Sequence, residues 1–330
     1  MKKDNLKLSE QNKYKKILLT GTFPDKLNGN LSIRNYIVSE SQGLTTISVS
    51  NYPTDSLYYV REEKFDLVLG VGSILPDTDY VSKLSQIARQ LKVPLALWLH
   101  DDPYEVDYNY KVENCCDVIF TNDKNSIFSY NRKNVFHLPL AGSVSHHYKE
   151  IKDTQKLIDI SFCGIGYENR KRIISRLKHV LSTKNTRIYG EQWQPDLNFT
   201  NNTKLDTQEY INLAAKSLFT INIGREFNLA NERNNIVPST PGPRTFEVAL
   251  AGSAQIMFTD SLEILNYFEY KKEILLFSNV DEFECLVNAG IADPAYPLKI
   301  ALAAQKKALA EHTYKHRLIE LLNICNEVLN

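Results

Sequence analysis

An imidazole and two carboxylates follow one another at His100, Asp101 and Asp102, directly after the apolar run Val93–Leu99. Such groups can accept a hydrogen bond or a proton from a hydroxyl group of a substrate. Three interpretations are open: aspartates that cap a following helix, groups that recognise a sugar and act as a base, and an acidic metal-binding pair. The spacing lacks an Asp-x-Asp form, which argues against the metal pair. We therefore favour sugar recognition and base chemistry.

A second pair of residues that could bind a ligand is Arg244 and Glu247, which lie between a Pro/Gly loop and an apolar strand. Pro243 suits the first turn of a short helix, and Gly252 suits its end. An acid in the first turn interacts favourably with the helix dipole, which would be a purely structural role. The alternative is that Arg244 and the loop amides bind a diphosphate while Glu247 binds a ribose. This alternative also places Ser239 and Thr245 at the nucleotide.

Glycines and an arginine after the apolar run Ile158–Cys163 predict a phosphate contact. Gly164 and Gly166 permit close approach of the backbone, and a following helix offers N–H groups to an anion. Arg170 would add a charge-assisted hydrogen bond. The alternative is an ordinary turn before a solvated basic helix. The glycine spacing does not match Gly-x-Gly-x-x-Gly, so we expect no dinucleotide cofactor.

Two further strands of the second half end in candidate ligand residues. Ligands of open α/β sheets lie beyond the carboxyl ends of the strands. Arg225 is then placed to neutralise a diphosphate, and Tyr189 with Gly190 to stack on a base. A surface arginine and a plain turn are the alternatives. The side chains of the adjacent His146 and His147 point apart, so we do not expect them to bind one metal together. We expect His312 and His316 to be structural, and we expect no metal site.

The elements that must position these residues alternate between helix and strand. Val81–Leu91 has apolar residues at helical spacing. Val93–Leu99 and Val118–Phe120 are apolar without alternation, which is typical of strands covered on both faces. The alternation restarts at Ile158, so the pattern predicts two doubly wound α/β domains. The predicted boundaries are a first domain at 1–138, a linker at 139–156, a second domain at 157–310 and a C-terminal helix at 311–330.

Composition argues against several classes of partner. The 330 residues include 39 Lys plus Arg and 39 Asp plus Glu, so the net charge is zero and no nucleic acid or anionic membrane is indicated. No run of about 18 apolar residues predicts a membrane span. The five cysteines show no metal-binding spacing, which suits a reducing, cytoplasmic setting. The first residues contain no apolar signal-peptide region.

Residues 244–252 read R-x-F-E-x-A-x-A-G, and further segments agree with one family in order and spacing. These segments are Trp98–Pro103, Asp117–Asp123, Ser161–Tyr167 with Arg170, Tyr189-Gly190 and His312–Arg317. The chain resembles the GT-B glycosyltransferases, particularly the CgeB-like bacterial group, from roughly residue 65 to residue 317. The resemblance implies two Rossmann-like domains that face a central cleft, with the C-terminal helix packed at their junction.

The resemblance also implies a reaction. The first domain would present an acceptor near His100, Asp101 and Asp102, and the second would bind a nucleoside diphosphate-sugar. The acceptor would be a glycan, a protein or a small molecule. Cations and helix N-termini would stabilise the leaving group, so we expect no metal and no further cofactor.

The chain departs from the family at one position. Many retaining enzymes of this kind have an acid eight residues before the ribose-binding glutamate, where this chain has Ser239. The resemblance favours retention, and the departure leaves the stereochemical outcome open. Two rival functions are a non-catalytic nucleotide- or glycan-binding protein of the same fold and a glycosyltransferase that acts on DNA. The neutral first domain argues against DNA.

Overall fold

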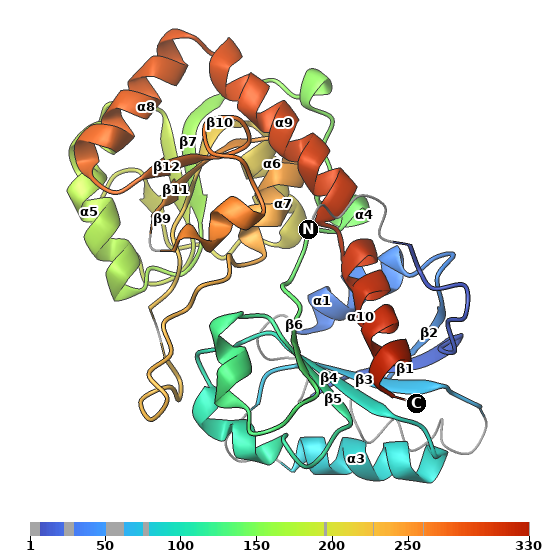
Figure 1. Cartoon of the computed structure of the whole chain (residues 1–330). Helices are drawn as coiled ribbons and strands as arrows, with labels where there is room; N and C mark the ends of the chain where they lie inside the picture. The colour runs from blue at the N-terminus through green and yellow to red at the C-terminus, as the bar shows by residue number, and fades with distance from the viewer. Residues whose placement is uncertain are drawn as a thin grey trace. The chain divides into compact units, whose positions relative to one another are not determined.

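The computed structural model describes residues 7–22, 30–50, 63–74, 79–194, 197–226, 228–259 and 261–329. The chain divides into two compact units, each with its own six-stranded parallel sheet (Figure 1). The first unit comprises Met1–Leu140, Asn228–Thr240 and Tyr314–Asn330, and the second comprises Ala141–Phe227 and Pro241–Thr313. The prediction of two doubly wound α/β domains is confirmed.

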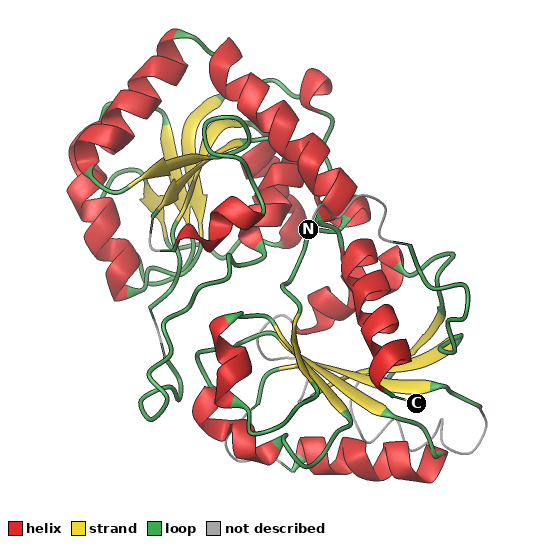
Figure 2. Cartoon of the chain, viewed as in Figure 1, coloured by secondary structure: helices red, strands yellow, loops and turns green. Residues whose placement is uncertain are grey.

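The sheet of the first unit has the strand order β2-β1-β3-β4-β5-β6. Its strands are β1 (Lys16–Gly21), β2 (Thr46–Val49), β3 (Leu67–Gly72), β4 (Leu95–Leu99), β5 (Val118–Thr121) and β6 (Val135–His137). Its helices are α1 (Asn30–Glu40), α3 (Tyr80–Leu91), α10 (Tyr314–Val328) and the 3₁₀ helices η1 (Val106–Lys111) and η2 (Asn125–Ser129). Helix α3 covers one face of the sheet, while α1 and α10 cover the other (Figure 2).

The core of the first unit explains why its central strands lack alternation. Every residue of β3 and β4 is buried, because helices cover both faces of the sheet. The indole of Trp98 is fully buried, and its Nε1 donates to the carbonyl oxygen of Leu138 at 2.9 Å. Its ring lies 6.0 Å from that of Tyr314, the first residue of α10. The end of the chain therefore completes the core of the first unit.

The sheet of the second unit has the order β12-β11-β10-β7-β8-β9. Its strands are β7 (Ile158–Cys163), β8 (Thr186–Tyr189), β9 (Thr200–Asn201), β10 (Ser217–Asn222), β11 (Ala254–Phe258) and β12 (Leu275–Phe277). Its helices are α4 (Val144–His147), α5 (Glu168–Ser182), α6 (Thr207–Ala215), α7 (Arg244–Ala251), α8 (Val280–Ala292) and α9 (Ala295–Glu311), with the 3₁₀ helices η3 (Ile151–Asp153) and η4 (Leu262–Asn266). Helices α5 and α8 lie on one face of the sheet, and α6, α7 and α9 on the other (Figure 1).

The structure divides the chain at different residues from those predicted. The predicted linker 139–156 contains α4 and η3, and its residues from Ala141 onward belong to the second unit. The predicted C-terminal helix at 311–330 is α10, and it belongs to the first unit. The largest difference is Asn228–Thr240, which the sequence pattern places in the nucleotide domain and the structure places in the first unit.

Backbone hydrogen bonds attach Asn228–Thr240 to the loops that follow β4 and β5. The carbonyl oxygen of Tyr104 accepts from the backbone N–H of Ala230 at 2.8 Å. At the other end, Asp123 Oδ2 accepts from the backbone N–H of Ser239 at 2.7 Å. Because these partners are more than a hundred residues away in the sequence, local periodicity contains no signal for this docking.

Candidate active site

Helix α7 positions the two charged residues that the sequence singles out in the second unit. Residues Thr245–Ala251 are buried, since α7 packs between α6, α9 and the sheet. Gly252 ends the helix with φ at 78°, a left-handed conformation that favours glycine. An added Cβ there would also overlap the side chain of Ile151. The first turn of α7 is thereby fixed against the carboxyl end of the sheet.

Arg244 and Glu247 form a charged pair on this first turn. Arg244 Nη1 donates to Glu247 Oε2 at 2.9 Å, and the guanidinium group lies 3.8 Å from the ring centroid of Tyr210 on α6. The Glu247 side chain is only 8% exposed, whereas that of Arg244 is 49% exposed. Burial raises the pKa of the Tyr210 phenol, so the ring stays neutral beneath the cation. The guanidinium group of Arg244 therefore stacks on Tyr210, while about half of the side chain is open to solvent.

A pocket of about 30 Å³ lies beside Arg244. Its walls come from the carboxyl ends of β7 and β10 and from helices α5, α6 and α7. The lining includes Cys163, Arg170, Tyr210, Asn222 and Arg244. Burial raises the pKa of the Cys163 thiol, which keeps it protonated. Ligands of doubly wound sheets bind at this edge, so the pair and the pocket form the candidate donor site.

Gly164 follows β7 and Gly190 follows β8, and the two loops that they begin are in contact. The backbone N–H of Gly164 donates to the carbonyl oxygen of Tyr189 at 2.9 Å. Gly190 has φ at 140°, and a Cβ on it would overlap the carbonyl group of Gly164. Trp193 Nε1 donates to that same carbonyl oxygen at 3.0 Å. These glycines let the two loops approach closely.

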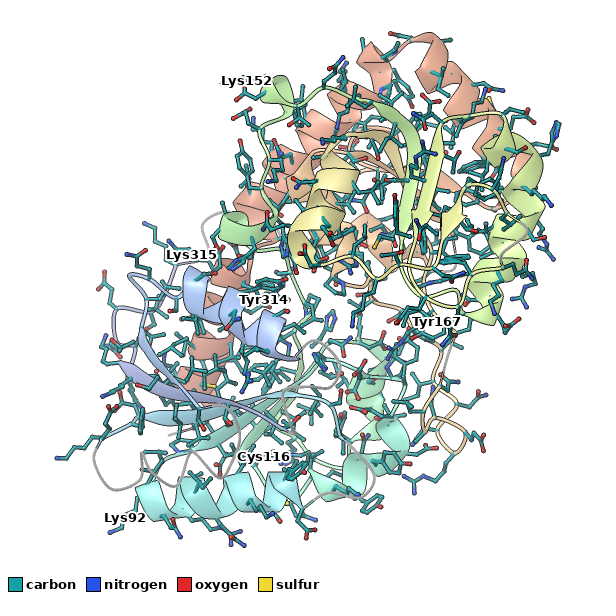
Figure 3. All side chains as sticks on the ribbon, turned by 180° about the vertical axis from the view of Figure 1, so that it is seen from behind. Lys92, Cys116, Lys152, Tyr167, Tyr314 and Lys315 are labelled. Atoms are coloured by element: carbon teal, nitrogen blue, oxygen red, sulfur yellow. The ribbon has the colours of Figure 1, made fainter. Side chains whose placement is uncertain are left out.

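Arg170 connects the loops after β7 and β10. Its Nη1 donates to the carbonyl oxygen of Ile165 at 3.1 Å, and its Nε donates to those of Ile223 at 3.1 Å and Gly224 at 3.2 Å. Its guanidinium group also lies 5.2 Å from the ring centroid of Tyr167. Tyr167, the residue before α5, is labelled in Figure 3. The structure thus gives Arg170 a clamping role at the edge of the pocket.

The other predicted donor residues lie in different places. Thr245 Oγ1 accepts from Asn222 Nδ2 at 2.8 Å, so it joins α7 to β10. Arg225 follows β10 and is half-buried. Ser239 belongs to the first unit, where its backbone N–H donates to Asp123 Oδ2 at 2.7 Å.

In the first unit, His100 and Asp101 meet a residue that the sequence analysis did not single out. Ser73 follows β3, and its hydroxyl donates to Asp101 Oδ2. His100 Nε2 lies 3.1 Å from Ser73 Oγ and 3.5 Å from Asp101 Oδ2. Parallel pairing of Gly72 on β3 with Leu99 on β4 places these three side chains at one edge of the sheet. All three residues are no more than 8% exposed.

Asp102 turns away from this trio. It is 1% exposed, and Tyr130 Oη donates to its Oδ2 at 2.7 Å. Burial raises the pKa of Asp102 from 3.8 to about 7, against the opposing effect of the Thr121 and Tyr130 hydroxyls. The sequence places Asp102 with its two neighbours, but the structure gives it a separate, interior set of partners.

Two residues of these sites lacked a clear sequence signal. Ser73 lies at the end of an apolar run, and only its position after β3 marks it as an edge residue. Tyr210 lies on α6, whose Asp206–Glu209 capping box predicts a helix and says nothing about a cation above the ring. Both depend on neighbours from distant parts of the sequence.

The histidines of the second unit have structural partners. His147 is fully buried and its Nδ1 accepts from the backbone N–H of Ser143 at 2.9 Å, and burial lowers its pKa. His312 Nε2 lies 3.1 Å from the carbonyl oxygen of Tyr267. Among the described residues, no three His, Cys, Asp or Glu side chains are arranged to hold a metal ion. None of the described helices combines the length and apolar character required to cross a bilayer.

The sequence of this chain is similar to those of known glycosyltransferase-like proteins. Residues 170–323 match the family model described as "Glycosyl transferase-like". The spore protein CgeB of Bacillus subtilis strain 168 is 23% identical over 239 residues, which cover 67% of this chain and 72% of CgeB.

Solved structures share the fold of the whole chain. Anabaena HepE in complex with UDP and glucose has a TM-score of 0.62 at 12% identity, with 95% of this chain and 100% of that chain covered. Sucrose-phosphate synthase from Thermosynechococcus elongatus has a TM-score of 0.64 at 9% identity, with 96% and 99% covered. These structures establish the architecture of two Rossmann-like domains. The chain therefore has the GT-B fold of two Rossmann-like domains, and its sequence is similar to those of CgeB and of glycosyltransferase-like proteins.

Proposed function

We propose that this protein transfers a sugar from a nucleoside diphosphate donor to a hydroxyl acceptor, with retention at the anomeric carbon and without a catalytic metal. The observation that supports it most directly is the pairing of Arg244 with Glu247 on the first turn of α7. This pair lies beside a pocket at the carboxyl ends of β7 and β10, where doubly wound sheets bind nucleotides.

Glu247 suits the ribose of the donor. An ionised carboxylate offers about four acceptor positions, and the contact with Arg244 uses Oε2. The two ribose hydroxyls are donors of the matching chemistry. Because the Glu247 side chain is 8% exposed, a hydrogen bond made there is shielded from competing water.

Arg244 suits the diphosphate of the donor. A guanidinium group has five N–H donors in a planar fork, so pairing through Nη1 leaves capacity for phosphate oxygens. The half-exposed side chain and the N-terminal dipole of α7 would stabilise the charge of the leaving diphosphate. Arg225 on the loop after β10 would add to this charge, while Arg170, Gly164 and Gly190 would keep the surrounding loops in place.

Because Anabaena HepE was solved in complex with UDP and glucose, uridine diphosphate is the first nucleotide to test and a hexose the first sugar. In the first unit, His100 and Asp101 would accept hydrogen bonds from hydroxyl groups of the acceptor or the sugar. The acceptor would be a glycan, a protein or a small molecule. Free thiols at all five cysteines suit a reducing compartment, so we place the reaction in the cytoplasm.

The deciding experiment is calorimetric titration of the protein with nucleoside diphosphates, followed by the same titration of Glu247→Gln. We expect one nucleotide to bind selectively, and the substitution to weaken binding at least tenfold, about 1.4 kcal/mol. Glu168→Gln on the exposed first turn of α5 is the matched control and should bind like the wild type.

Activity then separates an enzyme from a binding protein. The selected nucleotide sugar should be consumed, and proton NMR of the first product should show the donor's anomeric configuration. Selective binding without turnover would favour the non-catalytic alternative. Equal nucleotide affinity in the wild type and Glu247→Gln would contradict the assignment of Glu247.

A further inference from the structure

Three polar side chains form a network where β10, β11 and α7 meet in the second unit. Asn222 is the last residue of β10, and its Nδ2 donates to Thr245 Oγ1 at 2.8 Å and to Gln255 Oε1 at 3.1 Å. Gln255 Nε2 in turn donates to the backbone carbonyl oxygen of Thr245 at 2.7 Å. The register that pairs Thr220 with Gln255 places the side chain of Asn222, two residues later, on the same face of the sheet. Gln255 is fully buried and Thr245 is 1% exposed, so Asn222 is held from the interior.

The orientation of both amides follows from their partners, although an amide can be turned so that its oxygen and nitrogen exchange places. A backbone carbonyl oxygen only accepts, so Gln255 must direct Nε2 to Thr245 and Oε1 to Asn222. Oε1 also only accepts, so Asn222 must direct Nδ2 to it. The reversed Asn222 amide would set Oδ1 against Oε1 of Gln255. A buried contact between two acceptors is costly, so the network fixes the Asn222 amide in one orientation.

The group of the Asn222 amide that this network does not use is Oδ1. An amide nitrogen has two protons, and Thr245 and Gln255 accept one each. Among the residues that the structure describes, none donates a hydrogen bond to Oδ1. Asn222 is half-buried and lines the pocket beside Arg244. Oδ1 is therefore the acceptor that Asn222 offers to a ligand in this pocket.

The other charged residues of the pocket determine which ligand group suits Oδ1. Arg170 and Arg244 line the same pocket, and a guanidinium group only donates. An ionised phosphate oxygen only accepts, so it pairs with a guanidinium group but not with Oδ1. A hydroxyl group can donate to Oδ1 and accept from a guanidinium group at the same time. An alcohol is thus the ligand group that satisfies both kinds of lining residue.

We propose that Asn222 Oδ1 accepts a hydrogen bond from a hydroxyl group of the nucleotide sugar, and that Gln255 is the positioning residue that keeps Oδ1 available for it. The inference rests on the proposed function for its ligand, and the hydroxyl group belongs to the ribose or to the transferred sugar. The orientation of the amide is a property of the protein without ligand. Gln255 acts only through Asn222.

The first test needs no ligand and uses the full wild-type chain labelled with ¹⁵N at asparagine and glutamine. Side-chain amide protons that are bound to interior acceptors exchange slowly with water. We expect the Asn222 Nδ2 protons to exchange about tenfold more slowly, or slower still, than those of Asn212, an exposed asparagine on α6. The spectra of Asn222→Ala and Asn212→Ala assign the two sets of signals. Rapid exchange at Asn222 would show that the nitrogen is not held by Thr245 and Gln255, and would overturn the proposal.

The second test is calorimetric titration of Asn222→Ala with the nucleoside diphosphate that the wild type selects and with its hexose conjugate, beginning with uridine diphosphate and UDP-glucose. Loss of one hydrogen bond to the ligand should weaken binding by about tenfold. A loss for both ligands would assign the hydroxyl group to the ribose, and a loss for the conjugate alone would assign it to the transferred sugar. Asn212→Ala is the matched control and should bind like the wild type. Unchanged affinity for both ligands in a folded Asn222→Ala protein would overturn the proposal.

The third test addresses Gln255 through Gln255→Met, which keeps a long unbranched side chain in the interior and removes the acceptor of Asn222 Nδ2. We expect faster exchange of the Asn222 amide protons and weaker binding of the same ligand. Unchanged exchange at Asn222 in a folded Gln255→Met protein would contradict the positioning role. The wild-type exchange measurement decides the orientation of the amide even where this variant does not fold.

The two proposals fail in different ways. Slow exchange at Asn222 in a protein that binds no nucleotide would overturn the proposed function, and with it the ligand assigned to Oδ1. Selective nucleotide binding that depends on Glu247 but not on Asn222 would overturn the role of Oδ1 and leave the proposed function in place.

Discussion

Asp123 binds Ser239 across 116 positions of the sequence: its Oδ2 accepts from the backbone N–H of Ser239 at 2.7 Å. The same oxygen accepts from the backbone N–H of Thr240 at 2.9 Å. Pro241, the next residue, begins the second stretch of the second unit, and α7 with Arg244 follows three residues later. A buried carboxylate in the first unit thus fixes the segment that leads to the candidate donor helix.

Asp123→Ala should destabilise the protein by about 2–4 kcal/mol, because it removes the acceptor of two backbone N–H groups. Asp123 is 1% exposed, so water would not replace the carboxylate freely. Urea unfolding measures the loss. Asp123→Asn retains an acceptor oxygen and should lose less, and Asp153→Ala on an exposed surface should change little. Equal free energies of unfolding for Asp123→Ala and the wild type would show that this contact does not stabilise the protein.

Gly190→Ala should destabilise the protein by about 3 kcal/mol or more, because φ at 140° is strained for alanine and the Cβ would overlap the carbonyl of Gly164. Gly242→Ala is the matched control, since nothing lies within 4 Å of a Cβ at that position. Thermal unfolding of the two variants should separate them clearly. A mild effect at Gly190 would mean that the two loops separate at little cost.

Arg244→Lys should weaken binding of the selected nucleoside diphosphate by about tenfold, despite conservation of charge. A lysine ammonium cannot stack on Tyr210 and offer a planar fork to phosphate at once. Calorimetric titration gives the affinity. Arg172→Lys, whose side chain pairs with Glu226 on the surface, should leave the affinity unchanged. Equal nucleotide affinities of Arg244→Lys and the wild type would show that Arg244 does not bind the diphosphate.

The free energy of unfolding should decrease as the pH rises from about 4 to about 7, because of the carboxyl group of Asp102. Its pKa is raised to about 7 in the folded protein from an ordinary value of 3.8, so the folded state binds its proton more tightly than the unfolded state. The stabilisation is present below pH 4 and is lost as pH rises through 7. Asp102→Asn mimics the protonated form and should gain about 1–3 kcal/mol on the wild type between pH 5 and pH 8.

Urea unfolding at the two pH values tests this, with the difference between wild type and variant isolating Asp102 from other titrating groups. Tyr130→Phe serves as the companion variant, because it removes the hydroxyl that donates to Asp102 Oδ2. A constant difference between wild type and Asp102→Asn across this range would show that Asp102 is ionised throughout.

The sequence predicts a helix or strand well where hydrophobic patterning and the residues at its ends indicate the same element. Ile158–Cys163 has the predicted bounds, because an apolar run bounded by loop residues allows one compact solution. The short helix with Arg244 and Glu247 on its first turn follows in the same way from Pro243 and Gly252. The position of His100 and Asp101 at the edge of the sheet was predictable because they directly follow a buried strand.

Several candidate side chains have more possible partners than the sequence can rank. Arg170 and Gly164 have the chemistry of a phosphate site, but the structure gives Arg170 three carbonyl partners and packs Gly164 against Gly190. Asp102 has the chemistry of its neighbour Asp101, yet it turns toward Tyr130. Composition and spacing define which interactions a residue can make, and geometry selects among them.

The sequence by itself determined the two α/β domains, the helix that carries Arg244 and Glu247, and the edge position of His100 and Asp101. These follow from periodicity and from turn residues, which act over a few neighbours. Only the tertiary structure brought Ser73 to His100, Tyr210 beneath Arg244 and Ser239 to Asp123. Each of these contacts joins residues 27 to 116 positions apart, and such distances are closed by the packing of whole strands and helices rather than by any local preference of the chain.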